Sequence, residues 1–121
     1  MAEKKRIIVI GGSASGPKTA ARAKRLDQSA EVTIIQMAPE LSMASCGYPY
    51  FVGGVFNDRN ALLSTPYGEV RDPNFFYTTK DITAKTDTEV TAIDRDRKVV
   101  TCRNLSSGEV GYKTRSAEDL G

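Results

Sequence analysis

With 121 residues, the chain has room for a single domain. Hydrophobic residues make up 40% of it and charged residues 26%, a composition that excludes the disordered and fibrous classes and is typical of globular proteins. The net charge of +2 is too small to indicate a nucleic-acid partner. Because there is no histidine and the two cysteines, Cys46 and Cys102, lie far apart, we expect no metal site.

The N-terminal segment gives no sign of targeting or of a membrane anchor. Its apolar run, residues 7–10, is shorter than the core of a signal peptide, and a membrane span needs roughly 20 apolar residues. We therefore expect no membrane association and a location in the cytoplasm, where thiols stay reduced.

The first third of the chain predicts a nucleotide-binding unit. Residues 6–10 are a β-branched run of the kind buried on both faces of a parallel sheet. A helix is predicted over residues 14–26, with Pro17 in its first turn, where a missing N–H is tolerated. A second strand is predicted over residues 31–36. Strand, glycine turn, helix and strand in this order predict a right-handed βαβ unit.

The turn between the first strand and the helix reads Gly11-Gly12-Ser13-Ala14-Ser15-Gly16. Against the dinucleotide-binding pattern G-x-G-x-x-G, Gly11 provides the tight turn and Gly16 the close packing of helix on strand, while Ser13 replaces the middle glycine. The small Ser13 side chain leaves space for a pyrophosphate, and the N–H groups at the helix start favour an anion. A plain tight turn is the alternative.

About 20 residues beyond this turn, the pattern expects an acidic side chain that binds the ribose hydroxyls. The residue there is Gln36. Its amide can donate and accept hydrogen bonds but carries no charge. Gln36 is thus either a weakened ribose ligand or simply a polar strand end.

The predicted helix also carries a basic stripe. At 100° per residue, Lys18, Arg22 and Arg25 lie within about 60° of one another. Four residues lie on the side facing away from them: Thr19, Ala20, Ala23 and Leu26. The stripe is either the solvated face of an amphipathic helix or a site for a phosphate-bearing group.

The remainder of the chain predicts small elements. After a polar, turn-rich stretch, Asp72 can cap a short helix over residues 74–79, and residues 81–85 predict a short strand. Residues 89–94 and 98–103 predict a hairpin, and residues 109–113 a third strand of an antiparallel meander. Only two strands clearly belong to a parallel sheet, where five or six are common, so the chain is either a fragment or needs a partner to complete its sheet.

Cys46 lies between small and aromatic residues and is the candidate for chemistry. Residues 46–52 could form the first turns of a helix with Ser45 near its cap, which would lower the pKa of the Cys46 thiol. The alternative is a buried, unreactive cysteine. Phe51 occupies the place of a second cysteine in a C-x-x-x-x-C pair, so no dithiol is possible. Cys102, inside a predicted hairpin strand, is expected to be structural.

These features together resemble a known family. The residues that carry the resemblance are 8–16, 25–27, 42–50 and 88–94, in the same order and spacing as in the FAD-dependent pyridine nucleotide-disulfide oxidoreductases with one redox cysteine. Within that family, the segment around Cys46 is most similar to the coenzyme A-disulfide reductases, with NADH oxidases and peroxidases as looser relatives. The fold that we expect is therefore α/β, an incomplete Rossmann-like FAD-binding βαβ unit with a small antiparallel meander, and residues 1–121 would be the N-terminal part of an FAD-binding domain.

The resemblance implies a cofactor, a substrate and their contacts. FAD would receive a hydride from NAD(P)H and pass the electrons to Cys46, the catalytic residue, which would reduce coenzyme A disulfide or a related persulfide or polysulfide. Three residues of the basic stripe match coenzyme A contacts of the family. The implied FAD-binding residues are Gly11, Gly12, Ser13, Ala14, Ser15, Gly16, Gln36, Met37, Ser45 and Val90, with Val90 near the adenine. The implied coenzyme A contacts are Lys18, Arg22, Arg25, Ser42 and Ser45.

The chain also departs from the family. Gln36 stands where the acidic ribose ligand is expected, and Ala14 stands where the oxidases and peroxidases have a catalytic histidine. The second glycine motif for NAD(P)H and the dimerisation domain are absent, so the expected homodimer and complete turnover belong to a longer parent protein. Three alternatives remain: a nucleotide-binding module without catalysis, a fragment of a flavoprotein similar to the NADH oxidases and peroxidases, and a fragment that associates with itself to cover an open sheet edge.

Overall fold

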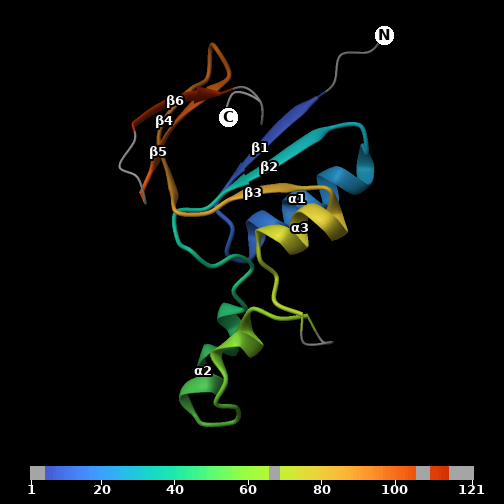
Figure 1. Cartoon of the computed structure of the whole chain (residues 1–121), viewed down its shortest axis with the longest axis vertical. Helices are drawn as coiled ribbons and strands as arrows, with labels where there is room; N and C mark the ends of the chain where they lie inside the picture. Colours follow the sequence, from blue (N-terminus) through green and yellow to red (C-terminus); the bar gives the residue numbers. More distant parts are fainter. Residues whose placement is uncertain (1–4, 66–68, 106–109, 115–121) are drawn as a thin grey trace.

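The structure, a computed structural model, describes residues 5–65, 69–105 and 110–114, the last range as backbone. Two three-stranded sheets and the helices form three layers (Figure 1). The central layer is parallel, in the order β1-β2-β3, and consists of β1 (Arg6–Ile10), β2 (Glu31–Ile35) and β3 (Thr83–Lys85). The predicted βαβ unit is confirmed, since α1 (Ser15–Leu26) connects the parallel pair β1 and β2.

The third parallel strand is a correction to the sequence analysis. A short strand was expected near residues 81–85, but it was not assigned to the parallel sheet. In the structure, β3 pairs with β2 in parallel, with Thr33 opposite Thr83 and Ile35 opposite Lys85. Three residues cannot show the alternation or apolar run from which a buried strand is recognised, so this long-range pairing left no local signal.

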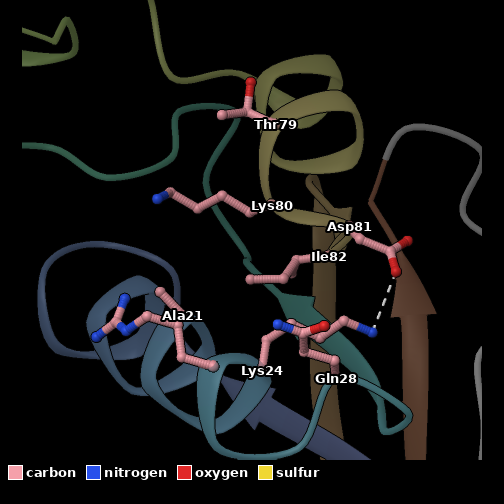
Figure 2. Close-up of a pocket in the computed structure, with 8 residues that line it drawn as sticks. Ala21, Lys24, Gln28, Thr79, Lys80, Asp81 and Ile82 are labelled. Atoms are coloured by element: carbon pink, nitrogen blue, oxygen red, sulfur yellow. Dashed lines mark ion pairs between the residues drawn. The ribbon is translucent and has the colours of Figure 1, made fainter.

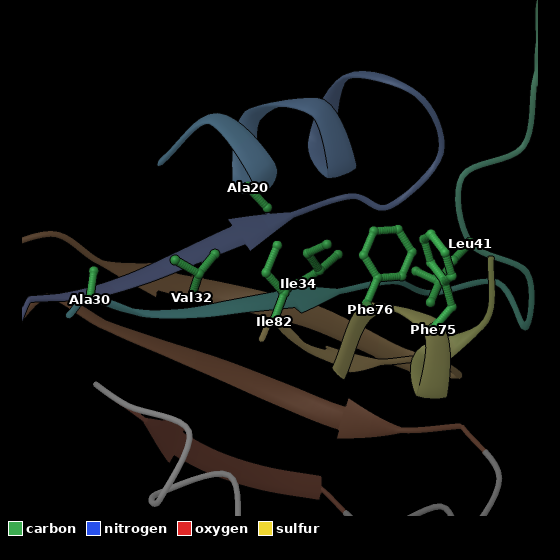
Figure 3. Packing of buried hydrophobic residues seen from close by; sticks show 8 residues of the cluster. All are labelled: Ala20, Ala30, Val32, Ile34, Leu41, Phe75, Phe76 and Ile82. Atoms are coloured by element: carbon green, nitrogen blue, oxygen red, sulfur yellow. The ribbon is translucent and has the colours of Figure 1, made fainter. Parts of the chain in front are cut away.

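The helices cover one face of the parallel sheet. Val32 and Ile34 of β2 point toward α1 and α3 (Pro73–Lys80), and Ala20 and Phe76 meet them from the two helices (Figure 3). This core consists of Ala20, Ala30, Val32, Ile34, Leu41, Phe75, Phe76 and Ile82, all at most 7% exposed. Since side chains alternate along a strand, the intervening residues of β2 face the opposite layer.

One expectation about α1 was wrong in part. Ala20 is fully buried, but Thr19 and Leu26, placed on the same side, are exposed, Leu26 to 70%. Ala20 and Leu26 differ by about 120° around the helix axis. The buried face is centred instead on Pro17 and Ala20, so Leu26 at the end of the helix turns away from the sheet.

The antiparallel meander covers the other face. It consists of β4 (Thr88–Asp94), β5 (Val99–Asn104) and β6 (Val110–Thr114), which confirms the predicted hairpin and third strand. Residue 109, the first of the predicted third strand, lies outside the described residues. Ile35 packs against Val100 and Cys102, and this second cluster holds the meander to the parallel sheet.

The capped helix is confirmed. Asp72 precedes α3, and its Oδ1 accepts a hydrogen bond from the Phe75 N–H at 2.8 Å. Proline at the first helical position fits this start, because that N–H has no partner inside the helix. The rings of Phe75 and Phe76 meet edge to face with centroids 5.5 Å apart.

Between β2 and α3, the chain leaves the sheets. This excursion includes η1 (Ser45–Gly47), α2 (Tyr48–Val52) and η2 (Arg59–Leu62), drawn in green below the sheets in Figure 1. It carries several exposed apolar side chains, among them Tyr50, Val52 and Val55. No helix in the described ranges is long and apolar enough to cross a membrane.

Candidate functional site

The glycine turn is tightly constrained. Gly11 has a φ of 102°, a backbone conformation that favours glycine, and its N–H donates to the Ile35 carbonyl oxygen at 2.8 Å. A β-carbon at Gly16 would lie 1.7 Å from the Gly11 carbonyl oxygen, so only glycine lets α1 start this close to β1. The turn therefore has the close approach of helix and strand that the dinucleotide pattern requires.

The start of α1 is open to an anion. Ala14 is the N-cap residue and no side chain caps the helix, whose first turn holds no acidic residue. Among the described residues, no backbone carbonyl accepts a hydrogen bond from the N–H groups of Ser13 or Ala14. Unpaired N–H groups and the helix dipole favour negative charge there. The glycine turn and the open helix start together fit a pyrophosphate.

The other predicted cofactor residues occupy different environments. Gln36 follows β2 directly and is half-buried, with its side-chain amide against Gly12 at a hydrogen-bond distance of 2.9 Å. The next residue, Met37, is 58% exposed. Val90 lies in β4, where it is partly buried against the cluster formed by Ile35, Val100 and Cys102.

A positively charged cavity opens beside the start of α1. Its volume is about 420 Å³, and it extends from Ser13 and Ala14 of the glycine turn to Ser42, Met43 and Ala44. Four cationic side chains and no carboxylate line it: Lys18, Arg25, Arg71 and Lys80. None of the four makes an ion pair with a carboxylate of a described residue. The charges of Lys18, Arg25 and Lys80 are thus available to an anionic ligand. The Arg71 guanidinium already donates hydrogen bonds to the Leu63 and Leu62 carbonyl oxygens, at 3.1 and 3.4 Å.

The cavity includes only part of the predicted coenzyme A set. Lys18, Arg25 and Ser42 line it, whereas Arg22 is exposed outside it and Ser45 lies beyond its edge. Sequence reasoning missed Arg71 and Lys80. They come from the segment before α3 and from its last turn, far from the α1 stripe in sequence, so no local pattern could have linked them.

A second cavity adjoins the first between α1 and α3. It has a volume of about 360 Å³ and shares Ala21, Arg25 and Lys80 with its neighbour. Figure 2 shows Lys80 extending from the end of α3 toward α1, and the ion pair between Lys24 and Asp81 at 3.2 Å. The Lys24 Nζ also donates to the Ala30 carbonyl oxygen at 2.7 Å, so this lysine is held by the protein and is not free for a ligand.

Cys46 lies on the surface, in the 3₁₀ turn η1. The expectation of helical turns from this position is confirmed, and Ser45 directly follows the N-cap residue Ala44, although no side chain caps the turn. Gly47 allows close packing, because a β-carbon there would lie 2.6 Å from Leu62 Cδ2. Ala44, two residues before the thiol, lines the cationic cavity, whereas Cys46 itself does not.

Cys102 has the opposite environment. It is fully buried in β5, and this burial raises the pKa of its thiol, since the thiolate would lose its hydration. The predicted structural role of Cys102 agrees with its burial. The described residues contain no cluster of carboxylates and cysteines able to hold a metal ion.

The fold and the glycine turn define the class of protein. The model of the pyridine nucleotide-disulphide oxidoreductase family, whose members depend on FAD and NAD(P)H, matches residues 5–117, and the chain belongs to this family. The resemblance found in the sequence is thereby confirmed.

Two relatives with similar sequences are both coenzyme A disulfide reductases. The chain is 38% identical over 105 residues to the coenzyme A disulfide reductase of Staphylococcus haemolyticus and 36% identical over 104 residues to that of Staphylococcus epidermidis. These matches cover 87% and 86% of the chain but only 22% of each relative, so the chain spans about a fifth of their length.

Solved structures show the same similarity. An NAD-dependent persulfide reductase from A. fulgidus superposes with a TM-score of 0.81 at 39% identity, covering 88% of this chain and 20% of that one. The reduced CoADR-RHD from Bacillus anthracis superposes with a TM-score of 0.78 at 29% identity, covering 89% and 18%. A water-forming NADH oxidase from Lactobacillus brevis, at 23% identity and a TM-score of 0.75, shows the fold alone.

Proposed function

We propose that the chain forms the FAD-binding portion of an NAD(P)H-dependent disulfide oxidoreductase in which Cys46 is the single redox cysteine. Its substrate would be coenzyme A disulfide or a related persulfide or polysulfide. The names of the relatives support the substrate class, and the cationic cavity beside the glycine turn supports it from the structure. A homodimeric parent protein in the cytoplasm belongs to the same proposal.

The observation that carries this proposal is the position of the cavity. It begins at the glycine turn and ends at Ser42, Met43 and Ala44, just before the turn that exposes Cys46. A molecule with phosphates at one end and a sulfur at the other matches this order. Lys18, Arg25 and Lys80 would bind its phosphates, and its sulfur would extend toward Cys46. Guanidinium and ammonium groups form charge-assisted hydrogen bonds with phosphate.

The chemistry assigned to Cys46 is thiol–disulfide exchange. The Cys46 thiolate attacks one sulfur of the substrate disulfide, a new S–S bond forms at Cys46 Sγ, and the other sulfur leaves as a thiolate that takes up a proton. Two electrons and a proton then release the second thiol and return Cys46 to its thiolate. A bound FAD would supply these electrons from NAD(P)H.

Within this chain, several parts would prepare that reaction. The N–H groups of Ser13 and Ala14 would bind the pyrophosphate of FAD. The N–H of Ser42, whose φ is 56°, donates to the Gly12 carbonyl oxygen at 2.6 Å, so the segment leading to Cys46 is hydrogen-bonded to the glycine turn. The closeness of Gly47 and Leu62 keeps the thiol turn packed on η2.

The first half of the reaction can be tested without electrons from NAD(P)H. Incubated with coenzyme A disulfide, the purified protein should gain the mass of one coenzyme A on Cys46 and release one equivalent of free thiol. Cys46→Ser should gain none, and Cys102→Ser should react like the unaltered protein. Binding of FAD, followed by its visible absorbance, should be the same in all three. Unchanged adduct formation in Cys46→Ser would contradict the proposal.

A second candidate is a nucleotide-binding module without catalysis. Its support is that the described residues contain one glycine turn, enough for one nucleotide. On this alternative the protein binds FAD, but coenzyme A disulfide leaves Cys46 unmodified. The same mass measurement therefore distinguishes the two candidates.

A further inference from the structure

The Gln36 side chain connects two segments that lie apart in the sequence. Its Oε1 accepts a hydrogen bond from the Gly12 N–H at 2.9 Å, and its Nε2 donates to the Glu40 carbonyl oxygen at 3.1 Å. We propose that Gln36 is a positioning residue that fixes the glycine turn to the segment leading to Cys46. Its position at the end of a strand, where a ribose ligand is expected, does not require either contact.

These two contacts need an amide. An amide has an acceptor oxygen and a donor nitrogen, whereas a carboxylate has acceptors alone. Rotating the Gln36 amide by 180° would set its NH₂ group against the Gly12 N–H and its oxygen against the Glu40 carbonyl oxygen, so the network fixes its orientation. A glutamate at position 36 could satisfy Gly12 but would face the Glu40 carbonyl oxygen with a second acceptor. Of these two side chains, only glutamine can therefore make both contacts.

The segment that Gln36 holds encloses Gly12. The Glu40 carbonyl is held by the Gln36 amide, and a β-carbon on Gly12 would lie 2.7 Å from Leu41 Cδ2 and 3.1 Å from the Gln36 Cβ. The Ser42 N–H donates to the Gly12 carbonyl oxygen at 2.6 Å. Both backbone polar groups of Gly12 are thus bonded, one to Gln36 and one to Ser42.

This arrangement links the two parts of the proposed site. Gly12 belongs to the turn that would bind the FAD pyrophosphate, and Ser42 lines the cationic cavity four residues before Cys46. Since Gln36 Nε2 has a second hydrogen and Oε1 a second lone pair, the same side chain can also contact a ribose. The positioning role concerns the ligand-free protein and does not depend on the proposed function.

Amide hydrogen exchange of the ligand-free protein, measured by NMR at single residues, tests the proposal. In Gln36→Leu, which removes both contacts, the Gly12 and Ser42 amides should each exchange about tenfold faster, the factor that corresponds to about 1.4 kcal/mol. In Gln36→Glu, which keeps the acceptor, the Gly12 amide should keep its protection, whereas Ser42 should exchange faster. The Gly11 amide, bonded to the Ile35 carbonyl oxygen, is the internal control and should not change in either variant.

A matched substitution controls for the chemical change itself. Gln28 is the other glutamine of the chain and is exposed just after the end of α1. Its replacement by glutamate should leave the exchange of the Gly12 and Ser42 amides unchanged. If the Gly12 amide exchanges at the same rate in Gln36→Leu as in the unaltered protein, the proposal is overturned. This holds even if FAD affinity falls, because a loss of affinity without faster exchange is expected of a residue that only binds the ribose. If Gln36→Leu does not fold, Gln36→Glu tests the proposal instead. Equal exchange rates of the Ser42 amide in this variant and in the unaltered protein would overturn the proposal as well.

Discussion

A β-carbon on Gly16 would lie 1.7 Å from the carbonyl oxygen of Gly11, so the first residues of α1 touch the backbone of the turn that precedes them. No rotation of a side chain can relieve this overlap, because both partners are fixed to the backbone. The closeness of these two glycines sets where the helix N-terminus points and hence where a phosphate would bind.

Gly16→Ala should therefore destabilise the protein by at least about 3 kcal/mol, the upper part of the range for overpacked sites, and should abolish FAD binding. Urea unfolding gives the first quantity and flavin fluorescence the second. Thr19→Ala, an exposed change on the same helix, should alter stability by less than about 0.5 kcal/mol. Equal stabilities of the two variants would show that the turn can move away from the helix.

The two cysteines should differ in their reaction with thiol reagents. Cys46 is exposed, whereas Cys102 is fully buried and the pKa of its thiol is raised by that burial. Under native conditions, iodoacetamide should modify Cys46 and spare Cys102. Modification of Cys102 should require unfolding.

Mass spectrometry of digested protein at neutral pH provides the measurement. Cys46→Ser should lose the fast native reaction, and Cys102→Ser should keep it. Native modification of both residues at similar rates would mean that the packing of the meander on β2 opens readily.

The positive charge of the cationic cavity should contribute to the binding of coenzyme A. Arg25→Gln and Lys80→Gln should each weaken coenzyme A binding by about threefold to tenfold, as expected for the loss of one partly exposed charge contact. Arg95→Gln, in the exposed hairpin turn, is the matched control and should have no effect. Calorimetric titration at two salt concentrations measures the changes, and the affinity of the unaltered protein should fall with salt. Equal affinities in all variants would place the phosphates elsewhere.

The start of α3 depends on Asp72. Its side chain accepts the hydrogen bond from the Phe75 N–H, so Asp72→Ala should lower the free energy of unfolding by about 1 kcal/mol. Asp96→Ala, in the exposed turn between β4 and β5, should change it by less than about 0.5 kcal/mol. Thermal unfolding of both variants compares the two effects. Since α3 carries Lys80, Asp72→Ala should also weaken the binding of coenzyme A.

The sequence predicted those features that depend on neighbouring residues. The β-branched run before Gly11, the cap at Asp72 and the turn of the hairpin each depend on a few adjacent residues, and the structure confirms a strand, a cap and a turn there. The expected burial of the first strand on both faces was wrong, because β1 lies at the edge of the described parallel sheet and none of its residues is fully buried. The pairing of β3 with β2 and the position of Lys80 beside Arg25 depend on residues far apart in the chain. The same holds for the contact of Gln36 with Gly12, 24 positions away. No local pattern encodes such contacts, so only the folded chain shows them.

The position of β3 also has a kinetic consequence. The strand pairs with β2, yet the whole excursion that carries Cys46 lies between them in the sequence. Closing so long a loop costs entropy before any contact compensates for it, and parallel pairing over such a separation is slow. During synthesis, β1, α1 and β2 can associate first, whereas the segment around Cys46 is anchored at both ends only after residue 85 has left the ribosome. The thiol turn would therefore be among the last segments to be fixed at both ends, and because Cys46 stays exposed in the folded protein, its thiol is accessible to oxidants before and after that step.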